Sequence, residues 1–292
     1  MDSNLEAIIQ TLAYADIFDY PLTREEIWEY IIFNNKGISK KRIFTILNKK
    51  NKFFEKKDNF IFLKARENNI EKRIRREKES TDKIKRANRI IKILSLIPGV
   101  DFIGISGALS MKNSEKNDDI DLFVITKKKS VWTTRLIMIF VLKILRVYRN
   151  RKDKEVSNKI CLNFLIDLSR LEFPKEKRDL FLAHEIAQIM PVFSRGRTYQ
   201  DFFGKNLWVK DFLPNVSDKK VKFRGSKNFF NFFISGLISN RIFEYISKKM
   251  QFEHMKKNIT KETVEDNFLA FHPFDYRSYV LGQYKSKIGK LI

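Results

Sequence analysis

Asp119 and Asp121 flank Ile120 at the start of the apolar run IDLFVIT (120–126). Because side chains alternate along a β-strand, both carboxylates are expected on one face, about 7 Å apart. Burial of an unpaired carboxylate is costly, so a cation is expected beside them. Such a pair can hold Mg²⁺ or Mn²⁺ ions, which clamp the attacking and leaving oxygens of a displacement at phosphorus. The alternative is a surface turn before the strand, in which acidic side chains accept backbone hydrogen bonds.

The residues before these aspartates predict a strand and a loop. VDFIGIS (100–106) has the pattern of a short strand, and GALSMKNSEKN (107–117) that of a loop with a helical turn. Gly107 would let the backbone approach phosphate groups closely, with amide N–H groups as donors. The candidate nucleotide-binding residues are Ser106, Gly107, Ala108 and Ser110.

The stretch GALSMKNSEKNDDIDLFVIT resembles the signature of the DNA polymerase β-like nucleotidyltransferase superfamily. In that signature a Gly-Ser pair after one strand is followed about a dozen residues later by Asp-x-Asp on the next. Gly107 precedes Asp119 by 12 residues, as in the minimal nucleotidyltransferases, although Ala108 replaces the usual Ser and Lys112 a frequent Gly. The chain is also similar to bacterial and archaeal nucleotidyltransferases with a winged-helix-like N-terminal domain, from ADIFDYPLT through KICLNF to FHPFD.

This resemblance implies a nucleotidyltransferase fold, Mg²⁺ or Mn²⁺ at Asp119 and Asp121, and a nucleoside triphosphate as substrate. Active members usually carry a third carboxylate on a later strand. The candidate strand KICLNFLID (159–167) has Asn163 near its centre and Asp167 at its end. Asn brings no charge to a metal, so Asp167 is expected as the third catalytic residue beside Asp119 and Asp121.

Residues 1–66 predict three helices followed by a β-hairpin. Thr23 and Glu26 form a capping-box pattern at the second helix, and Ser39 is expected to cap the third. This order resembles a winged helix, whose third helix commonly enters the DNA major groove. The cations that would suit phosphate contact there are Lys40, Lys41, Arg42, Lys49 and Lys50. Winged helices also serve as protein-packing modules, and this alternative stays open.

Residues 67–97 predict a long basic helix. Residues 64–97 hold twelve Lys or Arg and five acidic residues, with a thin apolar stripe, and Pro98 and Gly99 end the pattern. The helix is expected either along a nucleic acid backbone or, more typically of such a charge run, as a solvated connection between two domains.

The remaining chain completes an α+β fold. Residues 131–147 predict an apolar helix that covers the sheet, and residues 173–215 a helical segment with breaks at Pro191, Gly196 and Gly204. The expected domains are a winged-helix-like domain (1–66), a basic linker helix (67–97), a nucleotidyltransferase domain with a small mixed sheet (98–215) and a C-terminal helical region (216–292). In that last region, His272 is expected in a turn and Asp275 at a helix N-cap.

Composition limits the classes of protein that are possible. The net charge of +23 favours an anionic partner such as a nucleic acid or nucleotide, although abundant Lys, Ile, Asn and Phe also point to A+T-rich codons. Cys161 is the only cysteine, so no internal disulfide forms. The first residues, MDSNLEAIIQ, lack the features of a signal peptide. The apolar stretches 136–145 and 229–238 are too short to span a membrane. A cytoplasmic location is therefore expected. Gln188 interrupts an HExxH pattern at His184, which argues against zinc.

Two functions from different classes follow. The first is Mg²⁺-dependent transfer of a nucleoside monophosphate from a nucleoside triphosphate to an acceptor that is a small molecule, a protein or an RNA. The second is a nucleic-acid-binding regulator with a degenerate nucleotidyltransferase domain, which would use the basic N-terminal domain and linker helix. The sequence leaves the acceptor, the nucleotide base and the oligomeric state open.

Overall fold

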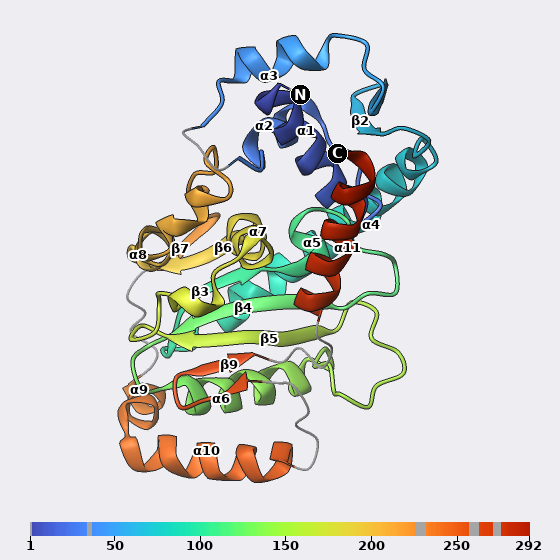
Figure 1. Cartoon of the computed structure of the whole chain (residues 1–292). Coiled ribbons are helices and arrows are strands. Elements are labelled where there is room, and N and C mark those ends of the chain that lie inside the picture. Colours follow the sequence, from blue (N-terminus) through green and yellow to red (C-terminus); the bar gives the residue numbers. More distant parts are fainter. Residues whose placement is uncertain (1, 34–36, 226–231, 257–262, 271–275) are drawn as a thin grey trace.

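A seven-stranded mixed sheet lies at the centre of the molecule, in the order β7-β6-β3-β4-β5-β9-β8 (Figure 1). The strands are β3 (Val100–Ile105), β4 (Ile120–Thr126), β5 (Ile160–Asp167), β6 (Met190–Arg195), β7 (Phe223–Gly225), β8 (Thr263–Val264) and β9 (Phe268–Ala270). β4 is parallel to β5 and β6 to β7, and the other neighbours are antiparallel. The computed structural model describes residues 2–33, 37–225, 232–256, 263–270 and 276–292.

Alternation along β4 divides the interior into two cores. Leu122 and Val124 pack toward the last turns of α4 (Asn69–Leu94) and toward α6 (Val131–Ile144). Phe123 and Ile125 pack on the opposite face, toward α7 (Leu180–Gln188) and α8 (Thr198–Lys205). Since Asp121 is two residues before Phe123, its side chain projects toward the α7 face.

The N-terminal segment contains the predicted helices and hairpin. They are α1 (Ser3–Asp16), α2 (Arg24–Glu29), α3 (Lys40–Leu47), β1 (Phe54–Lys57) and β2 (Phe60–Leu63). The predicted capping box at Thr23 and Glu26 is confirmed, and the Ser39 side chain caps α3. These elements share a separate core that includes Ile8, Ile27 and Ile43. The assignment of this segment to the winged-helix class stays a prediction.

The long basic helix forms as α4, but it is not simply a solvated connection. Ile90, Ile91 and Leu94 pack against the sheet. Two of its cations, Arg73 and Lys83, are buried, with exposed fractions of 4% and 3%. The periodicity of the apolar residues did not reveal this, because these cations turn toward polar loop atoms instead of solvent.

The segment 173–215 is not purely helical, because Met190–Arg195 forms β6 between β3 and β7. Pro191 lies within that strand, and Gly204 lies within α8 instead of ending it. The remaining short elements here are the 3₁₀ helices η1 (Lys175–Lys177) and η2 (Leu207–Asp211).

The region 216–292 also contributes strands, since β7, β8 and β9 extend the two sides of the central sheet. It contains α9 (Phe232–Ser239), α10 (Arg241–Lys256) and α11 (Tyr276–Leu291). α10 packs on α6, whereas α11 runs from the sheet to the N-terminal segment, beside α1 (Figure 1). The predicted turn at His272 and cap at Asp275 lie outside the described residues. Within the described ranges, every helix falls short of the length and apolar character that a membrane span requires.

Candidate functional site

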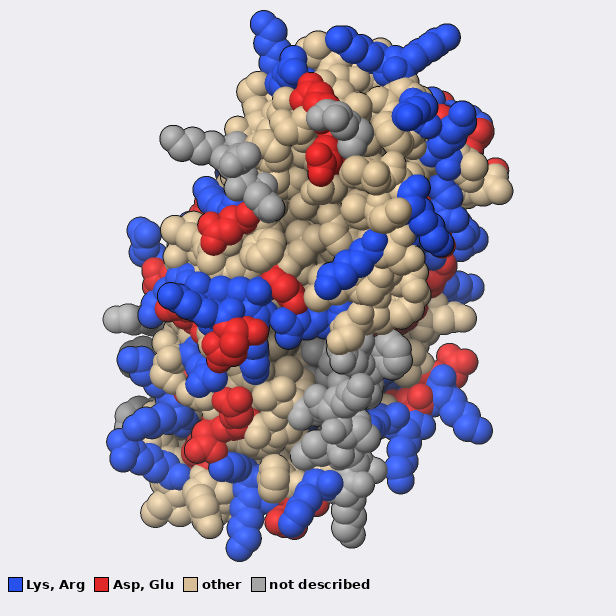
Figure 2. Space-filling model, viewed as in Figure 1, with Lys and Arg blue, Asp and Glu red and all other residues tan. Residues whose placement is uncertain are grey.

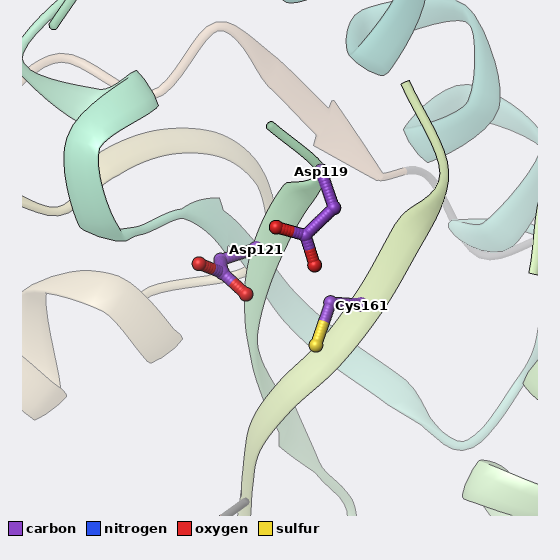
Figure 3. Close-up of side chains that lie close together, drawn as sticks. All are labelled: Asp119, Asp121 and Cys161. Carbon is purple, nitrogen blue, oxygen red and sulfur yellow. The ribbon is translucent and has the colours of Figure 1, made fainter. Parts of the chain in front are cut away.

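Asp119 and Asp121 lie close to a third side chain, Cys161, where the two parallel strands β4 and β5 begin. The strand register pairs Asp121 with Cys161. One carboxylate oxygen of each aspartate and the Cys161 Sγ all lie within 4.8 Å of one another. The two carboxylates and the thiol point toward a common space (Figure 3). The structure therefore brings together the two predicted metal ligands, although Asp119 precedes the first residue of β4.

Gly107 lies directly against Asp121. A Cβ atom at position 107 would stand 3.0 Å from the Asp121 Oδ2, and Gly107 has a φ of +62° that other residues rarely adopt. The Ser106 N–H donates to the Asp121 carbonyl at 3.0 Å, which fixes the loop to the strand. Glycine thus keeps the space beside the carboxylate open.

The other predicted nucleotide-binding residues have different surroundings. The Ser106 Oγ is buried and has no hydrogen-bond partner among the described residues, so it is available to a ligand. The Ser110 hydroxyl donates to the Gly107 carbonyl at 2.7 Å and so supports the loop. Ala108 lines the same cavity as Ser106 and Gly107.

Arg149 is the protein's own cation at this site. Its Nη1 lies 2.6 Å from the Asp119 Oδ2 and 3.4 Å from the Cys161 Sγ. Burial raises the pKa of Asp119, and the nearby Arg149 charge opposes that rise. Burial, followed by the charge of Asp119, raises the pKa of Asp121 to about 7. One guanidinium therefore does not fully compensate the two carboxylates.

The donor set fits one Mg²⁺ or Mn²⁺ ion better than two. Mg²⁺ is commonly bound by one or two carboxylates together with substrate phosphates. Burial raises the pKa of the Cys161 thiol well above its ordinary value, so Cys161 stays neutral. A neutral thiol is a poor ligand for a hard cation. Asp119 and Asp121 fit a first ion, and the described residues place no third carboxylate beside them for a second.

Asp167 does not complete the site, which corrects the expectation for this residue. It pairs with Thr126 at the opposite end of β5 from Cys161, and six residues of strand span roughly 20 Å. Its carboxylate accepts hydrogen bonds from the Lys129 N–H at 2.7 Å and the Ser169 N–H at 2.8 Å. Asp167 therefore stabilises a turn.

The turn alternative describes Asp118 better than its neighbours. The Asp118 Oδ2 accepts a hydrogen bond from the Glu115 N–H at 2.7 Å, within the loop that leads to β4. The Lys83 Nζ donates to the carbonyls of Glu115 and Asp118, each at 2.5 Å. The acidic run thus has two roles. Asp118 shapes the loop, whereas Asp121 lines the cavity with Asp119 close beside it.

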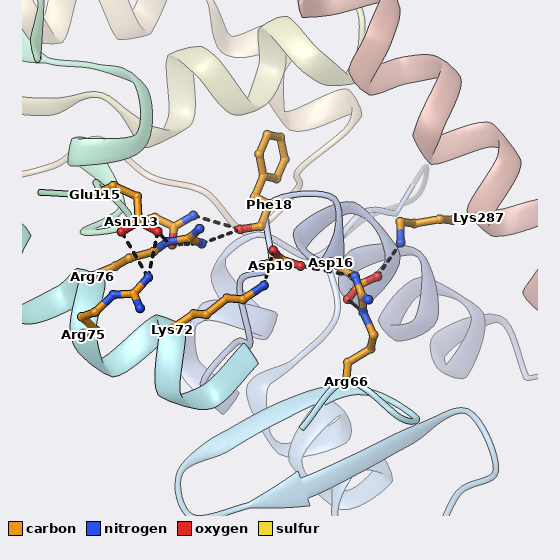
Figure 4. A network of polar contacts seen from close by, with 10 residues as sticks. All are labelled: Asp16, Phe18, Asp19, Arg66, Lys72, Arg75, Arg76, Asn113, Glu115 and Lys287. Carbon is orange, nitrogen blue, oxygen red and sulfur yellow. Dashed lines mark hydrogen bonds and ion pairs between the residues drawn. The ribbon is translucent and has the colours of Figure 1, made fainter. Parts of the chain in front are cut away.

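The N-terminal segment and α4 hold this loop in place. The Arg76 Nε lies 2.7 Å from the Glu115 Oε1, and its Nη1 donates to the Phe18 carbonyl at 3.1 Å. Asn113 Nδ2 also donates to the Phe18 carbonyl at 3.1 Å. Figure 4 shows this network from α1 and α4 to the loop. The position of the residues between Gly107 and Asp119 therefore depends on the N-terminal segment.

A cavity of about 780 Å³ adjoins Asp121. Its walls come from α1, α5 (Gly107–Ser110), β4, β5, α7 and α11. They are largely apolar and aromatic, and include Tyr14, Phe164, Phe181 and Tyr276. Asn163 lines the cavity as well, so the amide predicted near the centre of β5 faces the same space as Asp121.

His184 and Glu185 are placed differently from a zinc site. The His184 ring stacks on Tyr14 at a centroid distance of 3.8 Å, and burial lowers its pKa to about 4. Its Nδ1 lies 2.9 Å from the Leu180 carbonyl oxygen. Glu185 lines the cavity, and burial raises its pKa to about 7. His184 therefore packs against Tyr14, and both residues line the cavity.

Comparison with protein-family models, with curated proteins and with solved structures found no match to this chain. The hypothesis of a nucleotidyltransferase therefore rests on the sequence motif from Gly107 to Asp121 and on the geometry described above. Sequence reasoning missed Cys161, Arg149 and Glu185 as site residues. Only the pairing of β4 with β5 would have indicated Cys161, because position 161 meets Asp121 through strand register.

Proposed function

We propose that the chain binds a nucleoside triphosphate with Mg²⁺ or Mn²⁺ and transfers its nucleoside monophosphate to an acceptor, with release of pyrophosphate. The observation that carries this proposal is the convergence of Gly107, Asp119 and Asp121 at the edge of a cavity of about 780 Å³. That volume is typical of a pocket for a nucleotide-sized or drug-sized ligand.

Each residue has a defined role in this proposal. Asp119 and Asp121 hold the metal ion, and Gly107 leaves room for phosphate oxygens beside Asp121. The Ser106 Oγ donates to a phosphate oxygen, in place of the Ser that the family motif has at position 108. The metal supplies charge stabilisation for the phosphates and the leaving pyrophosphate. The aromatic walls of the cavity exclude water from the acceptor.

A crystal soaked with a non-hydrolysable ATP analogue and Mn²⁺ tests the proposal. Anomalous density between Asp119 and Asp121, with phosphate density beside Gly107, is the expected result. Asp167→Asn is the matched control, because it removes a carboxylate on the same sheet that lies apart from the site. Metal density at Asp167, or none beside Asp119 and Asp121, would refute the assignment.

A second candidate function is a nucleic-acid-binding regulator with a degenerate site. The ion pair between Arg149 and Asp119 favours this function, because the Arg149 guanidinium supplies an internal cation where a metal would bind. Exposed cations on and after α3 would provide phosphate contacts: Lys40, Lys41, Lys49 and Lys50. On the face shown in Figure 2, however, Lys and Arg are widely spread and interspersed with acidic residues. Such a distribution is less typical of a nucleic acid interface than a continuous basic stripe.

A salt titration tests this second candidate. Binding to duplex DNA or structured RNA that is dominated by phosphate contacts should weaken steeply between about 50 and 200 mM salt. Double replacement of Lys40 and Lys41 by Ala should reduce the slope of log affinity against log salt concentration by the contribution of about two phosphate contacts. Lack of measurable binding at low salt would remove this function.

A further inference from the structure

The cavity beside Asp121 contains an acidic side chain that the proposed transfer does not use. Glu185 lies on α7 and lines the cavity together with aromatic residues. Within the described part of the chain, no hydrogen bond or ion pair reaches its carboxylate. Burial raises its pKa, and among the described residues no cation offsets its charge.

The two Lys or Arg residues that the described ranges contribute to the cavity wall are engaged elsewhere. The Arg277 Nε lies 2.5 Å from the Asp179 Oδ2. The Lys177 Nζ stands over the Phe268 ring, 4.9 Å from its centroid. Glu185 is partly buried and lines a largely apolar cavity. Because a carboxylate in apolar surroundings normally has a cationic or hydrogen-bonding partner, we expect a ligand to supply the partner of Glu185.

The surroundings of Glu185 suit a cation that carries an apolar body. Tyr14 and Tyr276 line the same cavity as Glu185, and the charge of Glu185 contributes to the raised pKa of both phenols. Aromatic rings attract ammonium groups through their electron-rich faces. We propose that this cavity binds a small organic amine with an aromatic or apolar body, whose ammonium group pairs with the Glu185 carboxylate.

The volume of about 780 Å³ accommodates such a molecule close to Asp121. The charge of Glu185 also adds to the repulsion at Asp121, so the two carboxylates share one electrostatic environment. The amine would be the acceptor of the nucleotidyl group, and this identification rests on the proposed function. Binding of the amine does not depend on it.

Isothermal titration calorimetry without metal and without nucleotide tests binding of the amine separately from the proposed nucleotide site. The probes are 2-phenylethylamine, its neutral analogue 2-phenylethanol and the anion 3-phenylpropionate, each up to about 10 mM near pH 8, where most Glu185 is ionised. The variant is Glu185→Gln, which keeps the side-chain shape. The matched control is Glu176→Gln, which removes an exposed carboxylate outside the cavity lining. Thermal melts verify that both variants fold.

The amine is expected to bind wild type at least about tenfold more tightly than the alcohol. Glu185→Gln should abolish this preference, and Glu176→Gln should retain it. Equal binding of amine and alcohol by wild type, no binding of the amine, or a preference that survives Glu185→Gln would overturn the proposal. Guanosine is included as a neutral N–H donor. If Glu185→Gln weakened the binding of guanosine but not that of the amine, the proposal would also be overturned. Failure of the nucleotide site leaves this readout unaffected, since no nucleotide is present.

Discussion

At the scale of single residues, the two aspartates are poorly compensated without an added cation. Arg149 pairs with Asp119, whereas Asp121 faces Asp119 and a neutral thiol. The pKa of Asp121 rises from its ordinary value of 3.8 to about 7. The ionised form of Asp121 is therefore less stable in the folded chain than in the unfolded chain, and it destabilises the fold.

Asp121→Asn should consequently stabilise the metal-free protein, since Asn resembles the neutral acid. The cost of Asp121 is absent below pH 3.8, grows as the pH rises from 3.8 to about 7, and is complete above that. At neutral pH the variant should gain roughly 2 to 4 kcal/mol. Urea denaturation with a chelator, repeated across this pH range, measures the gain. A variant less stable than wild type at every pH would show that Asp121 accepts structural hydrogen bonds.

Cys161→Asp should add a third carboxylate to the two that the described residues place at this site. Without metal the added charge should lower the melting temperature, because it repels Asp119 and Asp121. With metal, affinity for Mn²⁺ should rise at least about tenfold, since a charged oxygen replaces a neutral thiol. Titration of free Mn²⁺ by electron paramagnetic resonance measures this, with Cys161→Ser as the neutral control. Equal affinities of the Asp and Ser variants would place the metal away from position 161.

At the scale of elements, the sequence pattern predicted the helix caps, hairpins and strands that are determined by residues close together in the chain. The capping box of α2, the β1–β2 hairpin and the strand IDLFVIT were all evident in the sequence. β6 was missed because Pro191 resembled a helix break, whereas its strand is stabilised by pairing with β3, far away in the chain. β7, β8 and β9 have only two or three residues each, too few for a periodic signal.

The same reason explains which parts of the site were predictable. Gly107, Asp119 and Asp121 belong to one continuous motif, so their proximity followed from spacing. Cys161 joins them only through the register of β4 and β5, and Glu185 only through the packing of α7 against the cavity. Asp167 was chosen for its charge, although strand length places it far from the motif.

α4 acts on the site through Lys83, whose ammonium group binds two carbonyls of the loop. Lys83→Met should lose these hydrogen bonds and leave the carbonyls of Glu115 and Asp118 without this donor. We expect a loss of roughly 1 to 3 kcal/mol in unfolding free energy and weaker nucleotide binding. Urea denaturation and calorimetry measure the two effects. Lys85→Met, which removes an exposed cation paired with Asp82, should change stability by less than about 0.5 kcal/mol. Similar losses in both variants would contradict a role of Lys83 in the loop.

At the scale of the whole molecule, Asp16 connects both ends of the chain. Its carboxylate lies 2.6 Å from the Arg66 Nε and 2.5 Å from the Lys287 Nζ of α11 (Figure 4). The Asp16 side chain is only 6% exposed, while its partners are partly exposed. This ion-pair group holds α11, which lines the cavity, against the N-terminal segment.

Asp16→Asn should therefore destabilise the whole chain by about 1 to 3 kcal/mol, because two cations lose a buried partner. The control is Glu67→Gln, since Glu67 pairs with Lys57 where both side chains are more than half exposed. That change should cost less than about 1 kcal/mol. Chemical denaturation followed by circular dichroism gives both values. If Asp16→Asn were as mild as the control, α11 would be held by apolar contacts alone.

The central claim is that Asp119 and Asp121 form a metal-dependent nucleotide site. Thermal melts of wild type and Asp121→Asn, each with ATP and Mg²⁺ or with ATP and a chelator, test it most directly. Wild type should be stabilised only when the metal is present, by about 2.7 kcal/mol when the ligand is 100-fold above its dissociation constant, and Asp121→Asn should not respond. A wild type that ignores ATP and Mg²⁺, together with an Asp121→Asn variant destabilised by roughly 1 to 2 kcal/mol, would contradict the metal site and assign the aspartates to a turn.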